Sequence, residues 1–148
     1  MSKQVEVTIT CPSCRTNFKT TLYRTIWGEY PENRALVMRD EINIATCSSC
    51  RQRFKIPMPF MYTNSDKNFA VWWEPRHDPQ IDNDTNVYKQ TTGSDSYFST
   101  APRIADWDDF KETIKKFEAG ILKGKAPQKM DMKSMLQQMI KNKKLKNE

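Results

Sequence analysis

The sequence predicts an α+β fold, in which antiparallel β-hairpins surround a four-cysteine metal site and helices follow toward the C-terminus. Three observations support this prediction. Two near-identical decapeptides, TCPSCRTNFK and TCSSCRQRFK, each place a Cys-x2-Cys pair between stretches rich in β-branched and aromatic residues. An apolar stripe with helical spacing follows residue 106. Hydrophobic residues make up 37% of the 148-residue chain, so we expect a metal to supply stability that a small core cannot.

Strands are expected on both sides of each cysteine pair. Polar and apolar side chains alternate before the first pair with the two-residue period of a strand. After the second pair, Pro57 and Pro59 restrict the chain to an edge strand or an extended arm. In chain order, the expected elements are strands at 5–10 and 18–27, a short helix or turn at 31–42, strands at 42–46 and 53–63, and a strand at 68–75.

Helices are expected toward the C-terminal end, after a polar interval. Residues 76–102 are dense in Asp, Asn, Thr, Ser, Gly and Pro, which predicts a linker or a long surface loop. Asp106 is a candidate N-cap for a helix whose apolar side chains recur every three or four residues. A second, methionine-rich helix is expected after a break near residue 127. The apolar stripe of the first helix consists of Trp107, Phe110, Ile114, Phe117 and Ile121.

The four cysteines form two pairs with the spacing C-x2-C-x32-C-x2-C. Two residues between cysteines allow a tight turn, or knuckle, that points both sulfurs at one ion, and two knuckles supply four thiolates to a tetrahedral structural Zn²⁺. Two knuckles at the tips of hairpins are a zinc-ribbon-like arrangement. Arg15 and Arg51 follow the pairs where many knuckles carry glycine, and their charge suits a site of net charge −2. Phe18 and Phe54 are expected to be core residues beneath the knuckles. The predicted metal ligands are Cys11, Cys14, Cys47 and Cys50.

Other uses of the cysteines remain as alternatives. Two disulfides or free thiols are disfavoured in a reducing compartment. A thioredoxin-like use is disfavoured because neither pair opens a helix within a βαβ pattern. Iron is the main rival to Zn²⁺, because four thiolates in a tetrahedron also suit one iron ion, as in a rubredoxin-like electron carrier.

Several motifs together resemble those of the bacterial CpXC proteins. They are ITCPSC, INIATCSSC, PMPFMY, an aromatic stretch ending in WWEP, and RIADWDDFKETIKKFEAGI, which together span most of residues 3–122. The first pair fits the family's Cys-Pro-x-Cys pattern, whereas Ser48 replaces proline in the second, and neither pair is followed by glycine. The resemblance implies metal binding by the four cysteines, and it implies no activity.

Composition and charge suggest how the chain is organised and where it resides. The net charge of +6 comes from residues 123–148, which carry eight lysines and two acids, whereas residues 1–122 carry 16 basic and 16 acidic side chains. No apolar run is long enough to span a membrane, and the first ten residues lack a signal-peptide core, so we expect a cytoplasmic protein without membrane insertion. The expected parts are a zinc-ribbon-like β core at 1–75, a linker or surface loop at 76–102, a helix packing on the core at 103–123, and a basic, Met-rich helix or tail at 124–148.

The favoured function is a non-catalytic zinc-binding interaction module that contacts other proteins. No catalytic residue is predicted, because four thiolates leave no open metal position and the lone histidine, His77, has no partner recognisable in the sequence. The alternative is nucleic-acid binding, either through the lysine-rich tail or through a basic, aromatic face that combines the second knuckle with Trp72 or Trp73. Adjacent strand residues point to opposite faces, so at least one of these tryptophans is expected in the core. An enzyme is the remaining alternative, and the oligomeric state stays open.

Overall fold

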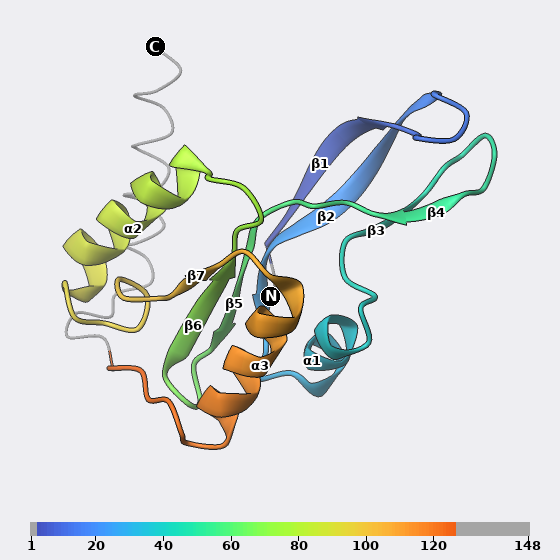
Figure 1. Cartoon of the computed structure of the whole chain (residues 1–148). Helices are drawn as coiled ribbons and strands as arrows, with labels where there is room; N and C mark the ends of the chain where they lie inside the picture. The colour runs from blue at the N-terminus through green and yellow to red at the C-terminus, as the bar shows by residue number, and fades with distance from the viewer. Residues whose placement is uncertain (1–2, 127–148) are drawn as a thin grey trace, which may run out of the picture.

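The computed structural model describes residues 3–126 and has the predicted α+β class, with one central sheet and a separate two-stranded hairpin (Figure 1). The central sheet has the order β1-β2-β5-β6-β7, and the hairpin is β3-β4. The elements are β1 (Lys3–Thr10), β2 (Asn17–Trp27), α1 (Pro31–Met38), β3 (Ile44–Thr46), β4 (Arg53–Lys55), β5 (Phe60–Asn64), β6 (Phe69–Trp73), α2 (Pro79–Thr92), β7 (Arg103–Ile104) and α3 (Trp107–Glu118).

The centre of the sheet is buried on both faces, because β5 and β6 lie between helices (Figure 1). Alternate residues of these strands point to opposite faces, and each face has its own apolar cluster. On the face of α1 and α3, Phe60 packs against Trp73 and Phe110. On the other face, Trp72 packs in a cluster with residues of α2 and the following loop. The expected packing of the α3 stripe on the sheet is confirmed for Phe110, Ile114 and Phe117.

The strand pairing is mixed rather than made of hairpins alone. The pairs β1–β2, β5–β6 and β3–β4 are antiparallel, whereas β2–β5 and β6–β7 are parallel. The first parallel pair joins the last residues of β2 to β5, so α1 and the β3–β4 hairpin lie within the crossover between them. This crossover is what carries the second cysteine pair back alongside the first.

The expected linker over residues 76–102 contains helix α2, which is a correction to the sequence prediction. Asp78 caps its N-terminus by accepting a hydrogen bond from the backbone N–H of Gln80 at 3.0 Å, and Pro79 occupies the first turn. The helix was missed because its Asp, Asn and Thr residues have low helix propensity and few apolar positions mark its buried side. Its buried residues are Ile81, Val87, Tyr88 and Thr92.

We expect Asp78→Ala to destabilise the protein by about 1 kcal/mol or more, the typical cost of losing an N-cap. The Asp78 carboxylate also lies 3.0 Å from Arg24 Nη1, so alanine removes an ion-pair partner from a mostly buried guanidinium. Asp78→Asn keeps a capping oxygen and should therefore cost less than alanine. Urea unfolding curves of the two variants would measure the difference, and equal stability of Asp78→Ala and the wild type would contradict the capping role.

Two further sequence predictions concern the C-terminal segment and insertion into a membrane. The expected methionine-rich helix falls mostly within residues 127–148, which lie outside the described residues. In the part of the chain that is described, no helix is both long and apolar enough to cross a bilayer.

Candidate metal centre

Each cysteine pair lies in a tight turn at the tip of a hairpin. The backbone N–H of Cys11 donates to Thr16 O at 3.0 Å, and that of Arg15 donates to Cys11 O at 2.9 Å. The second turn repeats this pattern, with Cys47 N–H donating to Gln52 O at 2.9 Å and Arg51 N–H to Cys47 O at 3.1 Å. The repeated sequence therefore folds into two repeated knuckles, as predicted.

The two knuckles face each other and bring all four cysteine sulfurs together. The four Sγ atoms of Cys11, Cys14, Cys47 and Cys50 lie within 4.8 Å of one another. Two of these distances cross between the hairpins, at 3.6 Å for Cys11–Cys50 and 3.5 Å for Cys14–Cys47. A metal bonded to four sulfurs at about 2.3 Å gives tetrahedral edges of about 3.8 Å, so the spacing fits a single ion.

The chemistry of the donor set also suits a metal ion rather than disulfides. All four cysteines are free thiols. The Thr16 hydroxyl, 3.2 Å from Cys14 Sγ, and the Thr16 backbone N–H lower the pKa of the Cys14 thiol to about 6. A backbone hydrogen bond at Gln52 acts to lower the pKa of Cys50, but desolvation and the neighbouring sulfurs outweigh it and raise that pKa to about 12. Four crowded thiols cannot all ionise until a cation offsets their charge, and a bound metal would supply that charge.

The arginines after the two pairs take the backbone conformation that glycine adopts most easily. Arg15 has φ 62° and Arg51 has φ 66°, in the left-handed region where an L side chain is disfavoured. The glycine that many knuckles carry at this position is thus explained by the turn itself. Here the turn keeps its shape with arginine, and both arginines are exposed.

Two contacts besides the cysteines join the hairpins below their tips. The rings of Phe18 and Phe54 meet edge to face, with centroids 6.2 Å apart. They are half-buried and contact each other instead of joining the two main apolar clusters, which corrects the expectation that they are core residues. Nearer the base, the Asn43 side chain accepts from the backbone N–H of Tyr23 at 2.7 Å and donates to its carbonyl at 3.1 Å.

We call residues 7–20 and 43–56 the arm. Figure 1 shows that both hairpin tips project together, away from the helices. Within the arm, the cysteine cluster lies at the tip, the Phe18–Phe54 contact beneath it and Asn43 at the base. An ion at the tip would therefore fasten the end of the arm that the core does not hold.

Lys55 joins the base of the arm to the core, which sequence reasoning did not foresee. Its ammonium lies 3.1 Å from the ring centroid of Trp107 in α3 and 4.9 Å from that of Trp73 in β6. Asp40 contacts the same tryptophan: its carboxylate accepts hydrogen bonds from Trp107 Nε1 at 2.6 Å and from Lys111 Nζ at 2.8 Å. The sequence marked Lys55 as basic, but no local pattern indicates which aromatic rings it reaches.

The tryptophan emission of the protein should titrate with a midpoint near pH 8. Burial lowers the pKa of Lys55 to about 8, so its ammonium beside Trp107 and Trp73 loses its charge there. Since the unfolded chain keeps this proton up to about pH 10.5, the Lys55 contribution to the free energy of unfolding rises as pH increases from about 8 to 10.5. Fluorescence recorded against pH measures the midpoint. Lys55→Met should lack the transition, and an unchanged transition in that variant would contradict the assignment.

Within residues 3–126, the other residues singled out in the sequence, Trp72, Trp73 and His77, do not form a second site. Trp72 is 2% exposed and Trp73 is 6% exposed, so neither is available to stack on a base as the alternative of an aromatic nucleic-acid face requires. His77 is exposed, as expected for a surface histidine. Its Nε2 atom lies 3.3 Å from Asp82, a partner contributed by the unforeseen helix α2.

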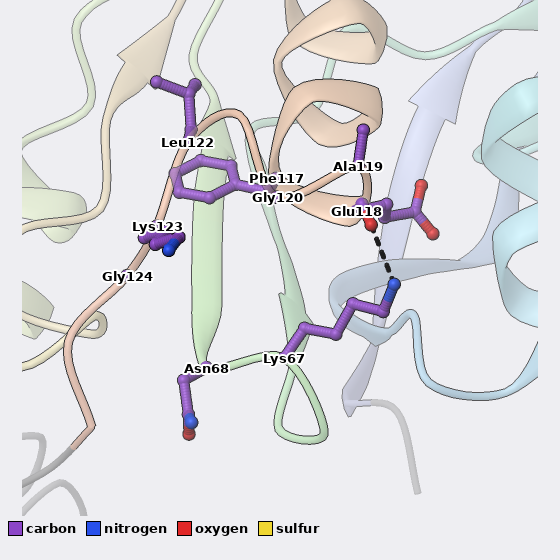
Figure 2. A pocket seen from close by; sticks show the side chains of 9 residues that line it. All are labelled: Lys67, Asn68, Phe117, Glu118, Ala119, Gly120, Leu122, Lys123 and Gly124. Carbon is purple, nitrogen blue, oxygen red and sulfur yellow. Dashed lines mark hydrogen bonds between the residues drawn. The ribbon is translucent and has the colours of Figure 1, made fainter.

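A cavity of about 370 Å³ lies at the C-terminal end of α3, on the side of the molecule away from the arm (Figures 1 and 2). Figure 2 shows Lys67 reaching across its edge to donate to the backbone carbonyl of Glu118 at 2.8 Å. A lysine at the last carbonyls of a helix has a capping role. We therefore interpret this contact as a cap on the C-terminal end of α3.

The comparisons with known proteins agree with the four-cysteine geometry. A family model described as CpXC protein matches residues 9–123, which include both cysteine pairs, strands β2 to β7 and helices α1 to α3. The comparisons with curated proteins and with solved structures found no match. The family match covers most of the chain. With both cysteine pairs inside the matched region, this chain belongs to the CpXC family.

Proposed function

We propose that the chain is a non-catalytic interaction module in which Zn²⁺, bound by Cys11, Cys14, Cys47 and Cys50, fastens two hairpins into one arm. The observation that carries this proposal is the meeting of four sulfurs from two hairpins within 4.8 Å. Four protein thiolates complete a tetrahedral sphere and leave no position for a substrate, which favours a structural role.

Zinc is favoured over iron within this proposal because a closed four-thiolate sphere without redox chemistry is the usual structural zinc site. The proposal places the chain in the cytoplasm, where reduced thiols are the rule and can bind a metal. The exposed arm tip is the surface we assign to a partner, because it projects from a core whose helices already cover both faces of the sheet (Figure 1).

Elemental analysis and hydrogen exchange together test the proposal. We expect one zinc per chain, whereas iron would appear as coloured protein. After chelation, backbone amides of the arm should lose protection while those of β5 and β6 keep it, since the Phe60 cluster does not involve the cysteines. A folded, metal-free protein whose arm amides stay protected would rule out the metal as the fastener.

A further inference from the structure

The arm has a charge composition unlike that of the rest of residues 1–122. Residues 7–20 and 43–56 contain five basic side chains and no Asp or Glu. The remainder of residues 1–122 contains 11 basic and 16 acidic side chains. Residues 1–122 are therefore neutral in total, but the arm is positively charged and the remainder of these residues, which we call the body, is negatively charged. Four thiolates with one divalent metal would contribute −2 to the arm, which leaves it positive.

The arginines of the arm also lack the partners that core arginines have. In the core, Arg24, Arg34 and Arg103 pair with Asp78, Glu118 and Glu74. Among residues 3–126, no carboxylate lies within ion-pair distance of the arginines at the arm tip, and all three are exposed. They are Arg15, Arg51 and Arg53. Lys19 has a long contact of 3.8 Å with Glu6, with both side chains exposed.

The surroundings of these arginines indicate what kind of anion they suit. Guanidinium groups bind phosphate oxygens through two parallel hydrogen bonds. The aromatic residues of the arm, Phe18 and Phe54, face each other, and Trp72 and Trp73 are buried, so no described ring near the tip is placed to stack on a base. Contacts to the backbone of paired strands need no such ring, whereas single-strand binding relies on stacking.

We propose that the arm tip binds the phosphate backbone of double-stranded nucleic acid through Arg15, Arg51 and Arg53. This inference rests on the proposed function, because the metal would hold the arginines of the two hairpins next to each other. It replaces the protein partner that the sequence favours. A duplex offers regularly spaced phosphates to the guanidinium groups of the arm tip, and the negative charge of the body limits the contact to the arm.

The test is a salt titration of binding to a labelled 20-bp DNA duplex, using the full chain with its metal. The key variant carries Arg15→Gly, Arg51→Gly and Arg53→Gln. Glycine relaxes the left-handed backbone at the first two positions, so the knuckles should keep their shape and their metal. The matched control carries Lys141→Gln, Lys143→Gln and Lys144→Gln, which removes the same charge from the C-terminal tail.

Three phosphate contacts predict a log–log salt slope of about −2.7, or about 40-fold weaker binding between 50 and 200 mM salt from these contacts alone. The arm variant should lose about that much slope, whereas the tail control should retain it. An arm variant that binds like the wild type overturns the proposal. So does equal or tighter binding of polyglutamate or phosphatidylserine vesicles, which would indicate an acidic protein or a membrane as the partner.

Failure of this inference can be separated from failure of the proposed function. Metal content and arm hydrogen exchange are measured on the wild type before and after chelation, without nucleic acid. If chelation leaves the arm ordered, the fastening role is wrong even where the arm variant loses duplex binding. If chelation disorders the arm but the arm variant binds like the wild type, the fastening stands and the partner assignment is wrong.

Discussion

Replacing Cys11 by serine should reduce metal affinity by at least about 100-fold, since even residues that only support metal ligands are worth 10–100-fold. Cys11 is fully buried and lies 3.6 Å from Cys50 across the two hairpins, so its loss removes a sulfur that no neighbouring side chain can replace. We expect a metal content near zero after dialysis against a weak chelator. Cys47→Ser, the corresponding change in the second knuckle, should behave alike because Cys47 is equally buried.

The effect should be local, and a matched control checks this. Ser48→Ala changes an exposed residue inside the second knuckle without removing a sulfur, and it should keep the full metal content. In Cys11→Ser, amides of the arm should exchange faster while the core keeps its near-ultraviolet circular dichroism. Full metal retention in Cys11→Ser would contradict the four-sulfur site.

The second large effect is expected from Phe60→Ala, which should lower the free energy of unfolding by about 3–5 kcal/mol. Phe60 is fully buried at the first residue of β5, and its ring contacts Trp73, Trp107 and Phe110 with centroids 5.4–6.1 Å away. Alanine would leave a cavity where the sheet, α3 and the base of the arm meet. Urea unfolding followed by circular dichroism measures the loss.

An exposed apolar residue beyond the C-terminal end of α3 provides the comparison. Ile121 is 72% exposed just after α3, so Ile121→Ala should change stability by no more than about 0.5 kcal/mol. If Phe60→Ala cost as little as Ile121→Ala, the cluster around Phe60 could not be the main source of stability. Removing the metal from the wild type should thus disorder the arm alone, whereas Phe60→Ala should lower the stability of the whole protein.

Local patterns in the sequence were sufficient for the cysteine cluster and for α3. A repeated decapeptide specifies a repeated turn, and the Asp106 cap with an apolar stripe specifies an amphipathic helix, so both follow from neighbouring residues. The facing of the two knuckles was predictable because four ligands with this spacing have few other uses. Strand alternation is also a local pattern, and it separates Trp72 and Trp73 onto the two faces of the sheet, as predicted.

The features that were missed depend on contacts between distant segments. Helix α2 gains its stability from burying Ile81 and Tyr88 against the second face of the sheet, a face that the sequence did not indicate. The parallel pairing of β2 with β5 joins residues more than 30 positions apart. The contact of Lys55 with Trp107 likewise joins two distant elements, β4 and α3, and no periodicity in the sequence indicates it.

The two outer strands of the central sheet differ in what they offer another chain. Strand β7 has only two residues and follows Pro102, so it is too short to pair with a further strand. The side chain of its first residue, Arg103, already pairs with Glu74 and Asp82. Strand β1 has eight residues, pairs only with β2 in the sheet order, and alternates exposed and half-buried side chains. Growth of the sheet by an added peptide would therefore take place along β1.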